Sequence, residues 1–205
     1  MTKEDFYYTI EKEATAEFKD RGSKFIGYAM PLNSVEAFKE RLNEIKKQHP
    51  KATHHCFAYR LGLDGNVYRV SDDGEPSGSA GRPILGQIDS KELVNVLVVV
   101  VRYFGGTLLG VPGLINAYKS AAALALQTTP LVQKQVEQEL VVQFDYTQLN
   151  EIMRVVKQYN GRVIKQELQL FCSLTIGVPK NRSQEVQYIL KEIRNVEVSV
   201  VKAVG

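Results

Sequence analysis

The apolar segment 93–104, LVNVLVVVVRYF, restricts the possible folds more than any other part of the chain. Between Val96 and Val101 both alternating sets of positions are apolar, so a strand formed here could leave neither face in water. We therefore predict a strand in the middle of a sheet that is covered on both faces. Arg102 ends this run, and because a buried guanidinium without a partner is costly, we expect an acidic side chain or a phosphate beside it.

Shorter patterns surround this segment. We predict hairpins over 13–32 and 53–70, and between them a helix that begins with a cap at Asn33. A short helix is expected at 83–88. The alanine-rich segment 114–127 is expected to form a helix that packs closely on the sheet.

A change of pattern after Pro130 divides the chain. The segment TTPLVQK is expected to be a short boundary, with one domain over residues 1–129 and a second over 134–205. The second part follows the order strand, helix, strand, strand, helix, strand, with Asp145 as the cap of its first helix. That order is the ferredoxin-like plan, which carries many unrelated functions. The expected fold class is α+β in both domains.

Composition restricts the partners. Lys and Arg (26) barely outnumber Asp and Glu (23), so the net charge of +3 excludes the overall basic field of a DNA-coating protein. No apolar run approaches the roughly 20 residues of a membrane span, and the first residues lack the apolar core of a signal peptide. Cys56 and Cys172 lie in different halves of the chain, so no disulfide is expected. We expect a cytoplasmic protein with no membrane partner.

The segment 70–87, VSDDGEPSGSAGRPILGQ, predicts a long polar loop before the buried strand. Its acids do not follow the spacing of a calcium loop, and we expect no metal there. The residues expected to shape the loop are Asp72, Asp73, Glu75, Ser77 and Gly78. If one of the three acids pairs with Arg102, the loop is an internal brace. If a phosphate does, the same region is a binding surface.

Glycines gather in this loop and after the buried strand, at Gly78, Gly81, Gly105, Gly106 and Gly110. Glycine lets backbone N–H groups converge on an anion ahead of a helix. The sequence has neither the Lys-Ser/Thr of a P-loop nor the G-x-G-x-x-G order, so a nucleotide site is not indicated. A contact with an anion or an RNA backbone and a tight turn without a ligand both remain open.

The run His54–Cys56 lies on a predicted strand, where alternate side chains face opposite ways. Zinc needs about four ligands, and a Cys-His dyad needs an orienting group and an oxyanion site, none of which the sequence identifies. We expect Cys56 to be a small buried residue beneath a helix. His55, Phe57 and Tyr59 share the other face, where they either stack nucleobases or form hydrophobic core.

Three blocks together resemble the YigZ/IMPACT family: ATHHCFAYR, SDDGEPSGSAGRPIL and RYFGGTLLG. The resemblance extends over essentially the whole chain. It implies an N-terminal β/α sandwich similar to domain IV of elongation factor G and a ferredoxin-like domain similar to its domain V. Both counterparts act against ribosomal RNA, and eukaryotic members of the family regulate translation.

We therefore expect a non-enzymatic protein, without a cofactor, that binds the ribosome or structured RNA and modulates translation. The expected phosphate contacts are Arg82, Arg102 and Lys119, near the turn at Gly105 and Gly106. His55 and Tyr103 are expected to offer ring surfaces. The alternative is a hydrolase or phosphate-ligand enzyme that uses the acidic loop and the His-His-Cys strand. A protein-interaction module without RNA contact is the third interpretation.

Overall fold

The computed structural model describes residues 5–169 and 171–201. The chain divides into two compact units: Tyr7–Lys134 forms the N-terminal unit, and the described residues from Gln135 onward belong to the C-terminal unit. Both combine helices with β-sheets, so the predicted α+β class is confirmed. Within the described ranges, no helix is long and apolar enough to cross a membrane.

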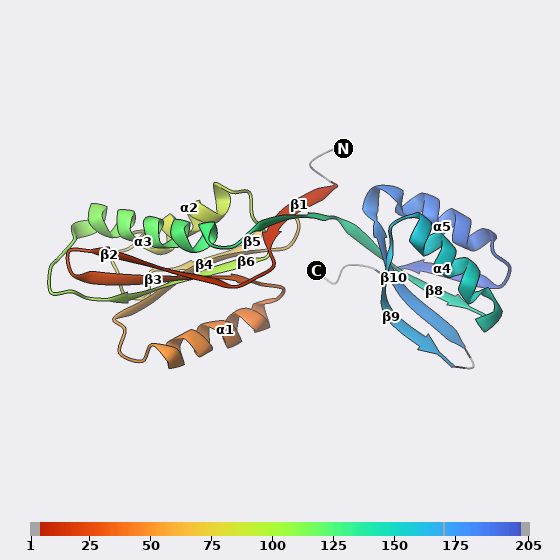
Figure 1. Ribbon diagram of the computed structural model, residues 1–205, viewed down its shortest axis with the longest axis horizontal. Helices are drawn as coiled ribbons and strands as arrows, with labels where there is room; N and C mark the ends of the chain where they lie inside the picture. Colours follow the sequence, from red (N-terminus) through yellow and green to blue (C-terminus); the bar gives the residue numbers. More distant parts are fainter. Residues whose placement is uncertain (1–4, 170, 202–205) are drawn as a thin grey trace. The chain divides into compact units, whose positions relative to one another are not determined.

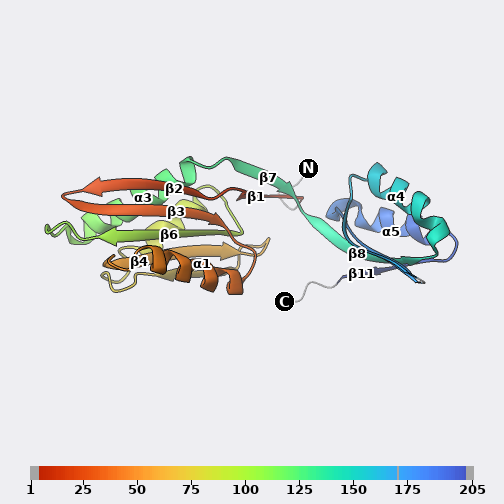
Figure 2. The same cartoon turned by 60° about the horizontal axis from the view of Figure 1, so that its bottom comes forward.

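A five-stranded sheet is the middle layer of the N-terminal unit (Figure 1). Its strands lie in the order β2-β3-β6-β4-β5, and each neighbouring pair is antiparallel. Helix α1 covers one face, and helices α2 and α3 cover the other (Figures 1 and 2). The elements are β2 (Ala14–Asp20), β3 (Ser23–Pro31), α1 (Val35–Gln48), β4 (His54–Leu61), β5 (Val67–Ser71), α2 (Gly81–Asp89), β6 (Val96–Tyr103) and α3 (Gly110–Gln127).

Strand β6 confirms the prediction of a central strand buried on both faces. All of its residues except the last are buried. Val98 and Val100 pack in the core beneath α2 and α3, whereas Val99 and Val101 pack in the core beneath α1. Fully burying a valine side chain contributes about 1.5–3 kcal/mol, so this one strand stabilises both cores of the unit.

The predicted hairpins and the helices at 83–88 and 114–127 are also confirmed. The predicted cap of α1 is wrong by one residue. Ser34, not Asn33, is the N-cap, and its hydroxyl accepts a hydrogen bond from the backbone N–H of Ala37 at 3.1 Å. The N-cap directly precedes the first helical residue, which is Val35, so Asn33 is one residue too early.

The segment after Pro130, expected to be a short boundary, contains a strand. Strand β7 (Leu131–Gln135) pairs with β1 (Phe6–Ile10) in a separate two-stranded sheet. Tyr8 also forms an isolated parallel bridge to Leu93, which lies just before β6. The start of the N-terminal unit is therefore joined to its end by backbone hydrogen bonds.

The C-terminal unit has the ferredoxin-like order of elements. Its sheet has the strand order β11-β8-β10-β9 with antiparallel neighbours. Helices α4 and α5 pack on one face of this sheet (Figure 1). The elements are β8 (Glu137–Phe144), α4 (Leu149–Gln158), β9 (Arg162–Leu168), β10 (Cys172–Pro179), α5 (Ser183–Glu192) and β11 (Val196–Val200).

Asp145 does not cap α4 as predicted. It precedes a short 3-10 turn, Tyr146–Gln148, and its side chain makes no hydrogen bond to a helix N–H group. Its carboxylate instead accepts a hydrogen bond from the amide of Asn195 at 3.0 Å. Helix α4 begins one turn later than a cap at Asp145 would place it. Asp145 instead ties the end of β8 to Asn195, the residue before β11.

Candidate functional site

The acidic loop, residues 72–80, is folded around the carboxylate of Asp72. One oxygen accepts hydrogen bonds from the N–H groups of Ala80 (3.0 Å) and Gly81 (2.8 Å), and the other accepts from Gly78 at 2.8 Å. Asp72 therefore satisfies the free donors where α2 begins. Partial burial opposes ionisation of this carboxyl, but the three backbone donors outweigh it and lower its pKa.

We expect Asp72→Asn to lower the free energy of unfolding by about 1–2 kcal/mol at pH 7, because an amide oxygen replaces an ionised acceptor at the helix start. The pKa of Asp72 in the folded protein is lowered. Its stabilisation is therefore complete above the unfolded pKa of about 4, and it is lost as the pH falls through the folded pKa. Urea unfolding at pH 7 and pH 3 measures this. A difference between variant and wild type that stays equal at both pH values would contradict the assignment.

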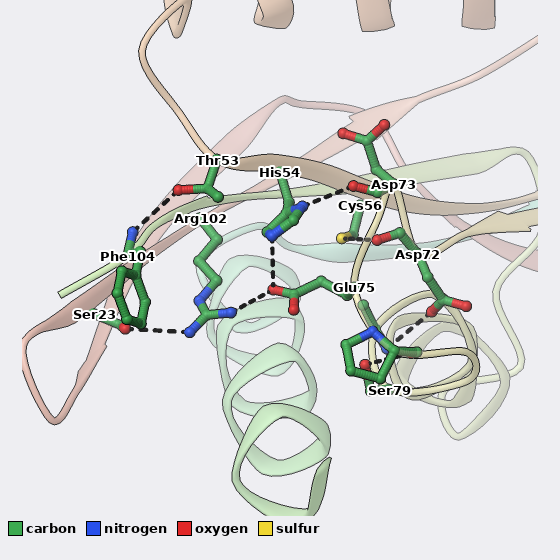
Figure 3. Close-up of polar contacts among 12 residues, drawn as sticks. Ser23, Thr53, His54, Cys56, Asp72, Asp73, Glu75, Ser79, Arg102 and Phe104 are labelled. Carbon is green, nitrogen blue, oxygen red and sulfur yellow. Dashed lines mark hydrogen bonds and ion pairs between the residues drawn. The ribbon is translucent and has the colours of Figure 1, made fainter. Parts of the chain in front are cut away.

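Glu75 is the acidic partner of Arg102. Its Oε1 lies 2.7 Å from Nη1 of Arg102, and both side chains are nearly inaccessible, at 4% and 6% exposed. The hydroxyl of Tyr118, on α3, donates to the same oxygen at 2.7 Å. His54 Nε2 lies 3.7 Å from it (Figure 3). One of the three acids therefore pairs with Arg102, which is the contact expected if the loop is an internal brace.

This pairing corrects the expected place of Arg102. The residue is 5% exposed, and its charge is paired with Glu75, so its side chain is not part of an exposed basic surface. Its guanidinium carbon lies 5.4 Å from the ring centre of Phe25 and 5.6 Å from that of Phe104. The reason is its position in β6, where the even-numbered side chains point into the core beneath α2 and α3.

Asp73 holds the acidic loop to strand β4. Its carboxylate accepts a hydrogen bond from the backbone N–H of His55 at 2.7 Å, and its backbone carbonyl lies 2.7 Å from Nδ1 of His54. The three acids of the loop thus have three separate contacts within the fold. Among the described residues, no group of three or more His, Cys, Asp or Glu side chains is placed to hold a metal ion.

Cys56 is buried beneath the helices, as expected. Its thiol donates to the carbonyl of Asp72 at 3.0 Å. Burial raises the pKa of this thiol. Burial also raises the pKa of the neighbouring Tyr118 hydroxyl. A nucleophilic cysteine needs a thiolate near neutral pH, and this environment disfavours one.

A second polar group, the tyrosine–histidine cluster, lies on the α1 side of the sheet; it comprises Tyr28, His49, His55 and Tyr103. His49 Nε2 lies 2.5 Å from the Tyr28 hydroxyl, and its Nδ1 lies 2.8 Å from the Tyr103 hydroxyl. His55 Nε2 lies 3.2 Å from the carbonyl of His49. Burial lowers the pKa of both histidines. At His49 the nearby His55 and Lys24 lower the pKa further, whereas at His55 the His49 carbonyl and Asp73 oppose the shift and Lys46 adds to it.

The glycine turn after β6 is set by backbone packing. A Cβ on Gly105 would lie 1.9 Å from the carbonyl carbon of Gly22, in the β2–β3 turn. The N–H of Gly105 also donates to the hydroxyl of Ser23 at 3.2 Å. Gly106 has a positive φ of 87°, which favours glycine. At Gly105 the close approach of two backbones is therefore sufficient reason for glycine.

The structure places the expected site residues on two sides of one sheet. Arg82 on α2 and Lys119 on α3 are exposed on one side. His55 and Tyr103 contribute to the tyrosine–histidine cluster on the other. Ser77 is exposed in the acidic loop. The single surface expected from the sequence is therefore divided by the sheet, because neighbouring strand residues point to opposite faces.

Sequence reasoning missed three participants. His49 and Tyr28 complete the tyrosine–histidine cluster, and Tyr118 shares the carboxylate of Glu75. The sequence carries one signal for Tyr118, which is the sole aromatic residue in the small-residue face of 114–127. His49 and Tyr28 meet only through the end of α1 and the pairing of β3 with β6.

Known proteins are similar to the N-terminal unit and to the chain as a whole. Residues 21–126 match the sequence model of the Impact N-terminal domain. A solved structure titled only as that of a hypothetical protein has a TM-score of 0.75 and 30% identity, and the match covers 97% of this chain and 98% of that one.

The curated relatives carry one family name. Escherichia coli "IMPACT family member YigZ" is 36% identical over 165 residues, which cover 80% of this chain and 81% of that protein. Bacillus subtilis "IMPACT family member YvyE" is 34% identical over 74% of this chain and 70% of that protein. The yeast "Protein IMPACT homolog" is 36% identical over 47% of this chain and 39% of its own length. The chain belongs to the YigZ/IMPACT family.

Proposed function

We propose that this chain is a cytoplasmic, non-enzymatic protein that binds structured RNA on the ribosome and modulates translation. The observation that carries the proposal is the tyrosine–histidine cluster at one end of the sheet, whose four residues are each partly exposed, although only 11% of the His55 side chain is accessible. Partly exposed aromatic and histidine rings are the groups on which proteins stack unpaired bases. The membership of the YigZ/IMPACT family supports the same proposal.

The charge around the cluster fits an RNA ligand. Burial lowers the pKa of His49 and His55, so both rings are neutral at pH 7 and their faces are suited to stacking. The positive charge comes from Lys24, which lies opposite Tyr103 in the β3–β6 pairing, and from Lys46 at the end of α1. Neutral rings beside lysines provide base contacts and phosphate contacts together.

The residues that a hydrolase would use here, in the acidic loop and the His-His-Cys strand, support a role without catalysis. The thiol of Cys56 is buried with a raised pKa, and Asp72 and Glu75 are engaged with backbone donors and with Arg102. Each of these groups has a contact that stabilises the fold. Their arrangement explains the acidic loop without a substrate.

Sedimentation with ribosomes tests the proposal. We expect the full chain to bind ribosomes saturably and to lose affinity as salt rises, because phosphate contacts release counterions. A Lys24→Ala, Lys46→Ala double variant should bind more weakly and reduce the salt slope by about two, one for each lost phosphate contact. The exposed ion pair of Lys24 with Glu17 contributes little to stability, so this variant should fold.

An Arg82→Ala, Lys119→Ala variant is the matched control, since these side chains lie on the opposite side of the sheet. It removes the same amount of charge and tests the phosphate contacts expected from the sequence. Loss of affinity in both variants indicates that RNA reaches both sides of the sheet end. Absence of binding at low salt, or equal binding by all three proteins, would refute the proposal.

A further inference from the structure

The guanidinium of Arg102 is incompletely satisfied. Nη1 pairs with Glu75 at 2.7 Å, while Nη2 reaches only the hydroxyl of Ser23 at the long distance of 3.4 Å. Nε is buried and has no hydrogen-bond partner, and within the described part of the chain it is the one buried side-chain nitrogen or oxygen in this state. A buried donor that makes no hydrogen bond destabilises the fold, and more so when the group is charged. Such an atom in a folded protein calls for an explanation.

The geometry of the guanidinium indicates what would satisfy it. The Nε and Nη2 hydrogens leave the same edge of the planar group in parallel, forming a fork that matches two oxygens of one carboxylate or phosphate. Glu75 uses the remaining nitrogen, Nη1, so the fork has one protein contact, the long one from Nη2 to Ser23, and Nε has none. In Figure 3, Glu75 lies on one side of the guanidinium, and Ser23 and Phe104 lie on the other.

Phe104 covers this side of Arg102. Its ring centre is 5.6 Å from the guanidinium carbon, and the residue is 48% exposed. Among the described residues, the three apolar core clusters do not include Phe104, so its ring lies outside these clusters. A movement of the ring would lose its attraction to the guanidinium.

The surroundings of the fork favour an anion. The neighbouring carboxylate of Glu75 pairs with Nη1, and the sequence from Phe104 to Lys119 contains no acidic residue. The hydroxyl of Ser23, which already meets Nη2 and the N–H of Gly105, adds a polar group at the same place.

We propose that the Nε–Nη2 edge of Arg102 is a binding site for a small oxyanion, a carboxylate or a phosphate, which enters when the ring of Phe104 swings aside. The site differs from the RNA surface of the tyrosine–histidine cluster, because it lies on the α2–α3 side of β6. It does not rest on the proposed function. A free anion and a phosphate of a nucleic-acid backbone share the required chemistry, and the experiment separates these two sources.

Nuclear magnetic resonance of the ¹⁵N-labelled full chain tests the site. The Nε–H signal of Arg102 is assigned by its absence in Arg102→Lys, and it is followed during titration with inorganic phosphate, acetate or a short single-stranded RNA. We expect a saturable shift of this signal. Phe104→Ala should bind several-fold more tightly, because the fork is open before the anion arrives. Arg102→Lys keeps the charge but loses the fork, and the backbone signals of Ser23 and Gly105 should report about tenfold weaker binding.

Leu108→Ala is the matched control, since Leu108 is 82% exposed in the same loop. This variant should bind like the wild type. Saturation by phosphate or acetate identifies a site for free anions, whereas saturation by RNA alone identifies a backbone phosphate as the source. The proposal is overturned if no titrant moves the Nε–H signal in wild type or Phe104→Ala, or if Phe104→Ala and Leu108→Ala bind equally. The comparison of these last two variants holds even if Arg102→Lys fails to fold.

Discussion

Replacing Glu75 with glutamine lowers the free energy of unfolding by about 3–5 kcal/mol, because it leaves the buried guanidinium of Arg102 without a counter-charge. The two side chains are 4% and 6% exposed, so water cannot replace the lost carboxylate. The new amide keeps the shape of the side chain and an oxygen for the hydroxyl of Tyr118. The decrease in stability therefore results from the lost charge and not from a cavity. Urea denaturation followed by circular dichroism at pH 7 measures it.

A double-mutant cycle with Arg102→Met provides the control. Methionine removes the charge and retains an unbranched chain between the rings of Phe25 and Phe104. The double variant should be more stable than Glu75→Gln alone, since removing both partners of a buried pair costs less than removing one. Additive effects of the two substitutions would show that the pair is not coupled. If Glu75→Gln lowers the free energy of unfolding by less than about 1 kcal/mol, the pair behaves like an exposed ion pair, which contradicts its burial in the structure.

The layers of the N-terminal unit could be predicted because the sequence of β6 by itself indicates where this strand lies in the sheet. An apolar run on both faces admits only a central position, and the capping and turn residues around it then place α1 and α2 to within two residues, whereas α3 begins four residues before its predicted start. Strand β7 was missed for the opposite reason. Its five residues, LVQKQ, are half polar and follow a proline, and only pairing with the distant β1 makes them a strand.

The candidate site could be predicted only in part. The sequence limited the partner of Arg102 to three acids or a phosphate, but the choice depends on geometry. Asp72 is occupied by the start of α2 and Asp73 by the backbone of His55, which leaves Glu75 to reach the guanidinium. The tyrosine–histidine cluster depends on strand register and on where α1 ends, neither of which is written in the spacing of its members.

Gly105→Ala is expected to lower the free energy of unfolding by about 3 kcal/mol. A Cβ there would lie 1.9 Å from the carbonyl carbon of Gly22 and 2.2 Å from the backbone nitrogen of Ser23. No rotamer change relieves a clash between backbones, so the β2–β3 turn and the turn after β6 must separate. This separation also breaks the hydrogen bond from Gly105 to Ser23. Thermal and urea unfolding of the full chain measure the loss.

Substitutions at two other glycines distinguish the effect of the steric clash from that of backbone strain. Gly106 has φ of 87°, and nothing beyond its chain neighbours lies within 4 Å of the place where a methyl group would be, so Gly106→Ala should cost about 1–2 kcal/mol through conformation alone. Gly86 lies inside α2 with the same open space, and Gly86→Ala should stabilise the protein by about 0.5–1 kcal/mol. If Gly105→Ala costs no more than Gly106→Ala, the contact with Gly22 is too loose to require glycine. The larger loss at Gly105 instead means that the position of Phe104, one residue earlier, depends on two backbones in contact.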